Sequence, residues 1–309
     1  MTPYQRYVAE EIAVDHADGL MTRREALRRL GLLGLTATAA SALLAACSSS
    51  ESSSNATTTS AAPSSAAPTS ASAAPVPPVT NAPGMSGAVA TQEITFGNLR
   101  GAFAPAANPK GAVLVVHENR GLTDHIRNVA GRFAGAGYSA LAIDLLSEAG
   151  GTGSFKDPAE ATAALTKISP DTNAANLKAG IGELERRVPG KKIGATGFCL
   201  GGGMTWLLLG SAEPRLAAAV PWYGPLGERT DFSGTKAAVL AIYAEKDARV
   251  NASRDAAVAA LQKADLTHEV FTAPGADHAF FNDTGQRYNA QAAEAAWQRV
   301  TAWFGTHLG

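Results

Sequence analysis

One short stretch, Gly197-Phe198-Cys199-Leu200-Gly201, constrains the fold more than any other part of the sequence. It follows a strand pattern at 192–196 and precedes a helix pattern at 200–209. A nucleophile between two glycines at such a junction is typical of a sharp turn that pushes the nucleophilic side chain out of the backbone. A cysteine stands where a serine is usual. Cys199 is therefore either a reactive thiol or a small buried side chain.

The chain from 91 to 309 alternates strand patterns with helix patterns. Continuous apolar runs are typical of parallel strands that are buried on both faces, and the segments between them have helical periodicity. This order predicts an α/β fold with a doubly wound, mostly parallel sheet and helices on both faces. The expected strands are 112–116, 138–143, 192–196, 216–220, 237–243 and 268–272, with antiparallel edge strands within 93–103, and the expected helices are 124–136, 173–187, 200–209, 252–264 and 287–304.

Polar side chains follow the ends of several of these strands. Doubly wound sheets carry their chemistry at the carboxyl ends of the strands, so residues that follow different strands meet at one edge of the sheet. The candidates in chain order are Glu118, Asn119, Cys199, Asp247 and His278. We therefore expect a site at this edge.

The order Cys199, Asp247, His278 matches the nucleophile–acid–histidine order of α/β-hydrolases. A thiolate is the nucleophilic form of cysteine, and an imidazole beside it can accept the proton and later return it to a leaving group. A carboxylate on the other ring nitrogen fixes the tautomer of the imidazole. The backbone N–H groups of Leu200 and Asn119 are the expected donors to an oxyanion.

Several separated stretches resemble the dienelactone hydrolase (carboxymethylenebutenolidase) family of the α/β-hydrolase superfamily. They are 117–122 with 125–127, 197–202, 243–247 and 274–280, and the resemblance spans nearly all of 91–309. It implies that Cys199 is the nucleophile, Asp247 the acid and His278 the base, and that Glu118 pairs with the resting thiol until substrate displaces it. It also implies a carboxylic ester hydrolase that acts on small esters or lactones through a thioester acyl-enzyme.

The sequence departs from this family where the substrate's charge is bound. Family members hold a substrate carboxylate with two arginines, but the chain has no arginine between Arg132 and Arg186 and none in 279–283. Arg120 and Arg287 are the residues that could partly compensate. We expect a pocket that suits a neutral acyl group. The candidate substrate-binding residues are Arg120, Phe280 and Tyr223, the last of which is equally well explained as a core residue.

Residues 1–46 predict an export signal rather than part of the catalytic domain. A twin arginine at 23–24 precedes an apolar stretch from 30 to 46, as in bacterial export signals, with the Tat or Sec route left open. Leu44-Ala45-Ala46-Cys47 resembles the bacterial lipobox, which implies a lipid on Cys47. The alternative is a transmembrane anchor, for which this segment is short and weakly apolar.

Residues 47–90 predict a disordered tether, because Ser, Ala, Thr and Pro bury too little apolar surface to offset the entropy of ordering. We therefore expect an exported enzyme that a lipid holds to the membrane on its periplasmic or other extracytoplasmic face. With Cys47 acylated, Cys199 would have no second cysteine with which to form a disulfide.

The composition limits the expected partners. The net charge is −1 and basic residues cluster only near the N-terminus, so we expect no nucleic-acid partner. No His, Cys and Asp cluster has the spacing of metal ligands, and we expect neither a metal nor a cofactor. A monomer is favoured. Two other hypotheses stay open, namely an acyltransferase or thioesterase on the same fold and a non-catalytic lipoprotein that serves as a binding module.

Overall fold

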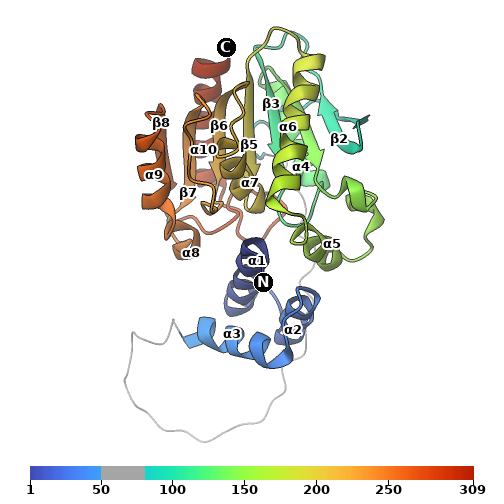
Figure 1. Ribbon diagram of the computed structural model, residues 1–309, viewed down its shortest axis with the longest axis vertical. Coiled ribbons are helices and arrows are strands. Elements are labelled where there is room, and N and C mark those ends of the chain that lie inside the picture. The colour runs from blue at the N-terminus through green and yellow to red at the C-terminus, as the bar shows by residue number, and fades with distance from the viewer. Residues whose placement is uncertain (50–80) are drawn as a thin grey trace, which may run out of the picture. The chain divides into compact units, whose positions relative to one another are not determined.

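The computed structural model describes residues 1–49 and 81–309. The chain divides into two compact units, Met1–Pro77 and Pro78–Gly309 (Figure 1). The second unit holds all of the predicted catalytic residues. The expected tether falls mainly on residues 50–80, which lie outside the described residues, so its disorder stays a prediction.

The described part of the first unit consists of three helices that contact one another, α1 (Pro3–Ala17), α2 (Arg23–Leu32) and α3 (Ala37–Ser49). Thr2 begins α1 with a capping box, because its hydroxyl accepts from the Gln5 N–H while the Gln5 side chain accepts from the Thr2 N–H. The expected apolar export stretch is divided between α2 and α3. None of the described helices is both long enough and apolar enough to span a membrane.

The second unit is built on an eight-stranded sheet in the order β1-β2-β4-β3-β5-β6-β7-β8. The two pairs β1–β2 and β2–β4 are antiparallel, and all the others are parallel. This arrangement confirms the predicted doubly wound sheet with an antiparallel edge. The strands are β1 (Gln92–Phe96), β2 (Leu99–Ala104), β3 (Gly111–Val116), β4 (Tyr138–Asp144), β5 (Ile193–Phe198), β6 (Leu216–Trp222), β7 (Ala238–Ala244) and β8 (His268–Ala273).

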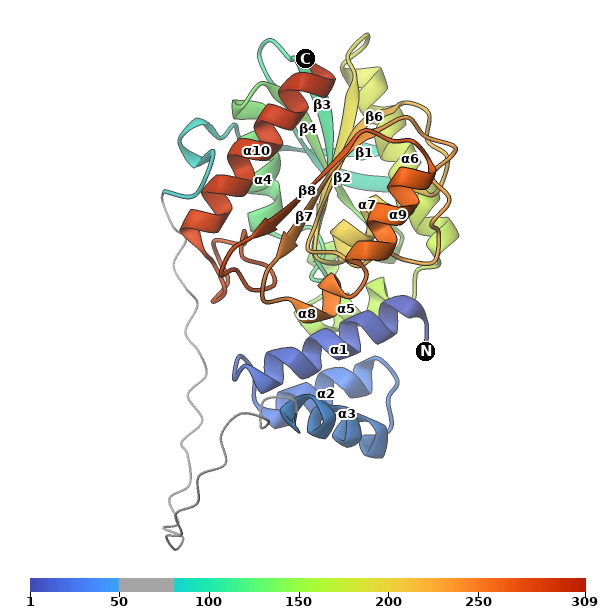
Figure 2. The same ribbon diagram turned by 90° about the vertical axis from the view of Figure 1, so that its left-hand side faces the viewer.

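Helices cover both faces of this sheet. Figures 1 and 2 show α4 and α10 on one face and α6, α7 and α9 on the other. Every residue of β3, β4, β5 and β7 is buried, which explains their continuous apolar runs. The helices are α4 (Asp124–Gly135), α5 (Pro158–Leu165), α6 (Pro170–Arg187), α7 (Leu200–Leu209), α8 (Ala248–Asn251), α9 (Arg254–Lys263) and α10 (Ala290–Leu308).

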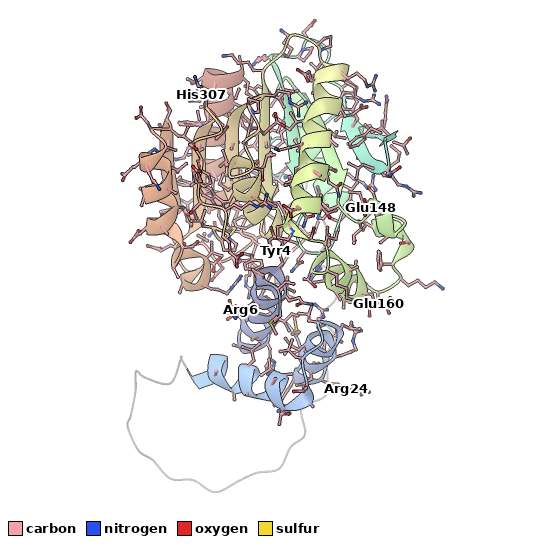
Figure 3. All side chains as sticks on the ribbon, viewed as in Figure 1. Tyr4, Arg6, Arg24, Glu148, Glu160 and His307 are labelled. Carbon is pink, nitrogen blue, oxygen red and sulfur yellow. The ribbon has the colours of Figure 1, made fainter. Side chains whose placement is uncertain are left out.

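Two segments after β4 form structure that the sequence analysis did not predict. The glycine-rich stretch contains two short 3-10 helices, η2 (Ser147–Ala149) and η3 (Thr152–Ser154), and α5 follows them. Glu148 in η2 and Glu160 in α5 mark these segments in Figure 3. Asp157 caps α5 by accepting from the Ala159 N–H.

The second unit begins before residue 91. Residues 81–90 include a short 3-10 helix, η1 (Met85–Gly87), and lie against α4. The Val89 N–H donates to the Gly131 carbonyl at 3.0 Å, and Gly84 sits so close to Trp297 that an added Cβ would lie 2.7 Å from its ring. The prediction that the tether extends to residue 90 is therefore wrong over 81–90, where glycine and small residues allow close packing.

Candidate active site

Cys199 lies at a sharp turn between β5 and α7. Its backbone has φ +56° and ψ −118°, a conformation that non-glycine residues rarely adopt and that is typical of strained functional turns. Two close approaches fix this turn. A Cβ on Gly197 would lie 2.1 Å from the Gly201 carbonyl oxygen, and one on Gly201 would lie 2.4 Å from the Val116 carbonyl oxygen. The motif therefore requires both glycines, and the thiol is held where β5 ends.

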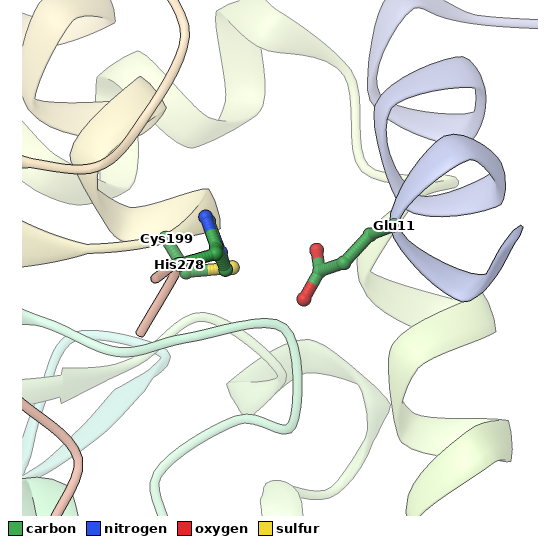
Figure 4. A group of neighbouring side chains, drawn as sticks. All are labelled: Glu11, Cys199 and His278. Carbon is green, nitrogen blue, oxygen red and sulfur yellow. The ribbon is translucent and has the colours of Figure 1, made fainter. Parts of the chain in front are cut away.

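His278 and Asp247 form a buried pair beside this thiol. The Nδ1 atom of His278 lies 2.5 Å from Asp247 Oδ2, and the Val250 N–H donates to Asp247 Oδ1 at 3.2 Å. The sulfur of Cys199 and a ring nitrogen of His278 lie within 4.8 Å of each other, and the two side chains are neighbours in Figure 4. The structure thus brings the three predicted residues together at the carboxyl ends of β5, β7 and β8.

The environment keeps Asp247 ionised. Burial raises the pKa of its carboxyl, but the charge and the hydrogen bond of His278 act in the opposite direction and, with Arg249 and the Val250 N–H, leave this pKa below its ordinary value. An ionised carboxylate on Nδ1 favours the tautomer in which Nε2 can accept a proton.

Glu118 joins the site from the end of β3. Its Oε2 atom accepts a hydrogen bond from Asn282 Nδ2 at 2.7 Å, while its buried Oε1 atom accepts none from the residues that the structure describes. The ring of Tyr223 lies edge-on to the ring of His278, with 5.2 Å between the ring centroids. Burial raises the pKa of Tyr223 well above its ordinary value, and the charges of Glu118 and Cys199 add to this rise. Glu118, Cys199 and His278 therefore all lie near Tyr223.

A buried ion pair fixes the loop that follows His278. Asp283 Oδ2 accepts from Arg132 Nη2 at 2.6 Å, and Oδ1 lies 2.7 Å from His125 Nδ1. Burial raises the pKa of the Asp283 carboxyl, but the hydrogen bond of His125 and the charge of Arg132 outweigh it and hold this pKa below its ordinary value. This ion pair anchors the loop to α4 and so keeps Asn282 beside Glu118.

A set of hydrogen bonds around Thr152 supports the loop that carries Glu118. Thr152 donates from its N–H to Asp144 Oδ2 at 2.7 Å and from its hydroxyl to Asp144 Oδ1 at 2.8 Å. The same hydroxyl accepts from the Leu122 N–H at 2.8 Å. The glycine-rich stretch after β4 therefore holds the loop at 117–122 in place, although it brings no charge to the site.

The remaining predicted residues lie at different depths. Leu200 is the first residue of α7, where a backbone N–H has no partner within the helix. Arg120 is exposed, and Arg287 is half-buried. Phe280 is fully buried, with its ring 5.4 Å from that of Tyr223, so both side chains belong to an aromatic cluster under the site. Their predicted roles in substrate binding stay predictions.

Comparison with known proteins identifies the family. The sequence pattern of the dienelactone hydrolase family matches residues 100–308. The chain belongs to this family. A Yersinia pestis protein assigned as a carboxymethylenebutenolidase is 34% identical over 212 residues, which are 64% of this chain and 79% of that protein. An Escherichia coli protein with the same assignment is 32% identical over 214 residues, 65% of this chain and 79% of that protein.

Solved structures agree with this assignment. A Klebsiella pneumoniae structure assigned as a dienelactone hydrolase is 31% identical, with a TM-score of 0.63, and covers 70% of this chain and 98% of its own. A dienelactone hydrolase-like promiscuous phosphotriesterase from metagenomic libraries, 22% identical with a TM-score of 0.63, shares the fold and covers 72% of this chain and 100% of its own. The predicted α/β-hydrolase fold is confirmed, and the chain is an ester or lactone hydrolase of this family.

Sequence reasoning missed two residues of the site. Asn282 was noted only as a position without arginine, yet its amide holds Glu118. His117 was not among the candidate residues, yet both of its ring nitrogens bond to the backbone near the site. Its position directly before Glu118, at the end of a buried strand, was the only sequence signal for a role of this kind.

Proposed function

We propose that this hydrolase uses Cys199 as a covalent nucleophile, with His278 as general base and acid and Asp247 as the group that orients the histidine. The observation that carries the proposal is the strained turn at Cys199, which presents its sulfur within 4.8 Å of a ring nitrogen of His278, whose Nδ1 atom is bonded to Asp247. Covalent acyl transfer requires a nucleophile beside a base, and a carboxylate that orients the base from its other side.

The proposed reaction has two halves. In the first, the Cys199 sulfur gives its proton to His278 and attacks the carbonyl carbon of the ester or lactone. A C–S bond forms, the C–O bond of the tetrahedral intermediate breaks, and the leaving alcohol oxygen takes the proton from the imidazolium. In the second, water gives a proton to His278 and attacks the thioester, and the thiolate leaves and regains its proton. An ester yields an acid and an alcohol, and a lactone yields a hydroxy acid.

The N–H groups of Leu200 and Asn119 are proposed as donors to the oxyanion of both tetrahedral intermediates. The first-turn position of Leu200 supports this role, because its N–H and the positive end of α7 lie next to the nucleophile. Gly201 packs against the carbonyl oxygens of Val116 and His117, which brings the first turn of α7 against the chain that leads to Asn119. Two donors from different elements can then converge on one oxygen.

Glu118 is proposed to hold the resting thiol until substrate arrives. Its buried Oε1 atom, which accepts no hydrogen bond from the described residues, supports this role, because a buried carboxylate oxygen calls for a donor. Its other oxygen is bonded to the uncharged amide of Asn282. A site that already holds one carboxylate beside an uncharged donor suits a neutral acyl group, and neutral short-chain esters or unsubstituted lactones are the substrates we propose.

We further propose that the enzyme is exported and held at the outer side of the cytoplasmic membrane through a lipid on Cys47. The twin arginine at 23–24 and the lipobox-like residues at 44–47 support this location. The thiol chemistry does not depend on it.

The test uses the purified full-length chain with Cys47→Ala, so that Cys199 is its single thiol. Hydrolysis of p-nitrophenyl acetate should begin with a burst of p-nitrophenol that equals the enzyme present, since acylation releases the phenol before water completes the cycle. Iodoacetamide should abolish the burst and the steady state in proportion to alkylated Cys199. Turnover by fully alkylated enzyme would refute the cysteine mechanism, and a thiol ester or acyl acceptor that outcompetes water would favour an acyltransferase.

A further inference from the structure

His117 has no part in the chemistry proposed above, although it is wholly buried at the end of β3, directly before Glu118. A buried histidine has to satisfy both ring nitrogens. Within 1–49 and 81–309, neither nitrogen bonds to a side chain. Both bond to backbone groups, one in the following residue and one in the chain after β4.

These two contacts define the tautomer of His117. The Leu145 N–H donates to Nε2 at 3.2 Å, so Nε2 is the acceptor and carries no proton. In a neutral imidazole the proton then resides on Nδ1, which donates to the Glu118 carbonyl oxygen at 2.7 Å. Burial lowers the pKa of His117, which keeps the ring neutral. The ring is therefore a fixed donor to a single carbonyl.

This bond determines where the next N–H points. A trans peptide is planar, with its C=O and N–H on opposite sides, and none of the described peptide bonds is cis. Because the Glu118 C=O faces the His117 ring, the N–H of the same peptide, which belongs to Asn119, faces away from that ring. The following peptide is also held, since the Thr162 hydroxyl of α5 donates to the Asn119 carbonyl oxygen at 2.8 Å.

We propose that His117 is a positioning residue that holds the Asn119 N–H toward the oxyanion formed on the acyl carbon attached to Cys199. The inference rests on the proposed cysteine mechanism and adds the device that fixes its second oxyanion donor. The packing of Gly201 against the carbonyl oxygens of Val116 and His117 supports it, because this contact places the first turn of α7 beside the two peptides that directly precede the 118–119 peptide.

Without the Nδ1–H donor, the Glu118 carbonyl oxygen keeps the longer hydrogen bond from the Gly121 N–H at 3.3 Å, so the 118–119 peptide is held less firmly. Loss of one oxyanion donor costs about 10²–10³ in kcat, and KM changes little because the ground-state carbonyl is bound less strongly than the oxyanion. His117→Phe removes the donor and keeps a ring of similar size. His117→Asn restores a donor at the place of Nδ1, whereas His117→Gln puts its amide nearer the place of Nε2.

The experiment measures two reactions of each variant, in the full-length chain with Cys47→Ala. The first is p-nitrophenyl acetate hydrolysis, which passes through oxyanions. The second is alkylation of Cys199 by iodoacetamide, which forms none. We expect His117→Phe to lose about 10² in kcat while its alkylation rate stays within about threefold of wild type. His117→Asn should recover at least about tenfold of that loss and should exceed His117→Gln by a similar factor.

His268→Phe is the matched control, since His268 lies on β8 and its Nδ1 bonds to the nearby Leu266 carbonyl. It should keep the wild-type kcat. A His117→Phe enzyme with near wild-type kcat, or with alkylation slowed as much as hydrolysis, would overturn the inference. If His117→Phe does not fold, the test is the kcat of the other two variants, and an equal kcat for His117→Asn and His117→Gln would overturn the inference. Failure of alkylation to stop wild-type turnover would count against the cysteine mechanism itself, and the two failures are therefore distinguishable.

Discussion

Replacement of Asn282 by arginine should change which substrates the enzyme prefers. Asn282 is half-buried and donates to Glu118 Oε2 at 2.7 Å, so a longer cationic side chain at this position can reach the Glu118 carboxylate and the space beside it. In the wild type, a substrate that carries its own carboxylate meets the charge of Glu118 with only an uncharged amide between them. We expect the wild type to favour neutral esters and unsubstituted lactones over carboxylate-bearing dienelactones.

The size of the effect follows from Coulomb's law. Two unit charges about 6 Å apart, at an effective dielectric constant of about 20, repel each other by about 2.8 kcal/mol. Glu118 is 9% exposed, so salt screens it only in part. If solvent at the pocket mouth removes half of the repulsion, about 1.4 kcal/mol remains, which is about tenfold in kcat/KM. Asn282→Arg should raise the ratio of kcat/KM for dienelactone to that for a neutral lactone by at least the same factor.

The assay is a paired kinetic comparison of the two substrates on one preparation, at low and at high salt. Asn282→Gln is the matched control, because it lengthens the side chain without adding charge and should leave the ratio within about twofold of wild type. The gain in Asn282→Arg should shrink at high salt. A wild type that prefers dienelactone, or an arginine variant with an unchanged ratio, would show that another group already supplies the positive charge.

Three further predictions concern the nucleophile, the anchor and the stability of the site. Cys199→Ser should fold with nearly the same Tm but lose at least about 10² in kcat, because the site is matched to a thiol; a near wild-type rate would contradict this. Cys47→Ala should abolish metabolic labelling by a palmitate analogue with activity unchanged, and persistent label would count against the lipobox. Asp283→Asn should lower stability by about 3 kcal/mol, or Tm by about 6–12 °C, because it leaves the Arg132 charge buried without its carboxylate. Because the pKa of Asp283 is depressed in the folded state, its contribution is complete above the unfolded pKa of about 4 and is lost as pH falls through the lower folded value. In acid titrations followed by circular dichroism, the wild type should therefore lose stability more steeply than Asp283→Asn below about pH 4, and parallel curves would contradict the assignment.

The sequence was most informative where one local pattern determines both structure and chemistry. Glycine on each side of Cys199 predicts the turn, because only glycine tolerates the close approaches found at 197 and 201. Asp247 and His278 were predictable because each follows a buried strand, and parallel strands end at one edge of the sheet. Their pairing then follows from topology.

The missed features depend on contacts between residues far apart in the chain. Asn282 and Glu118 are separated by 164 positions, and no local pattern indicates which side chain will meet a given carboxylate. The role of His117 depends on the Leu145 N–H, which becomes its neighbour only when β3 and β4 pair. One local signal was present but not used. Asp157 followed by Pro158 is a typical helix start, and it begins α5.

The close packing around Cys199 also determines how this enzyme can be diversified in the laboratory. At Gly197 and Gly201 a single added methyl group would overlap a backbone carbonyl oxygen, that of Gly201 in the first case and that of Val116 in the second, so random libraries at these positions should yield almost only inactive clones. Asn282, by contrast, reaches the site with its side chain from a loop that a separate ion pair anchors. Saturation mutagenesis there removes the hydrogen bonds that Asn282 Oδ1 accepts from Thr284, but it explores substrate preference without such an overlap, which makes Asn282 the productive starting point for directed evolution.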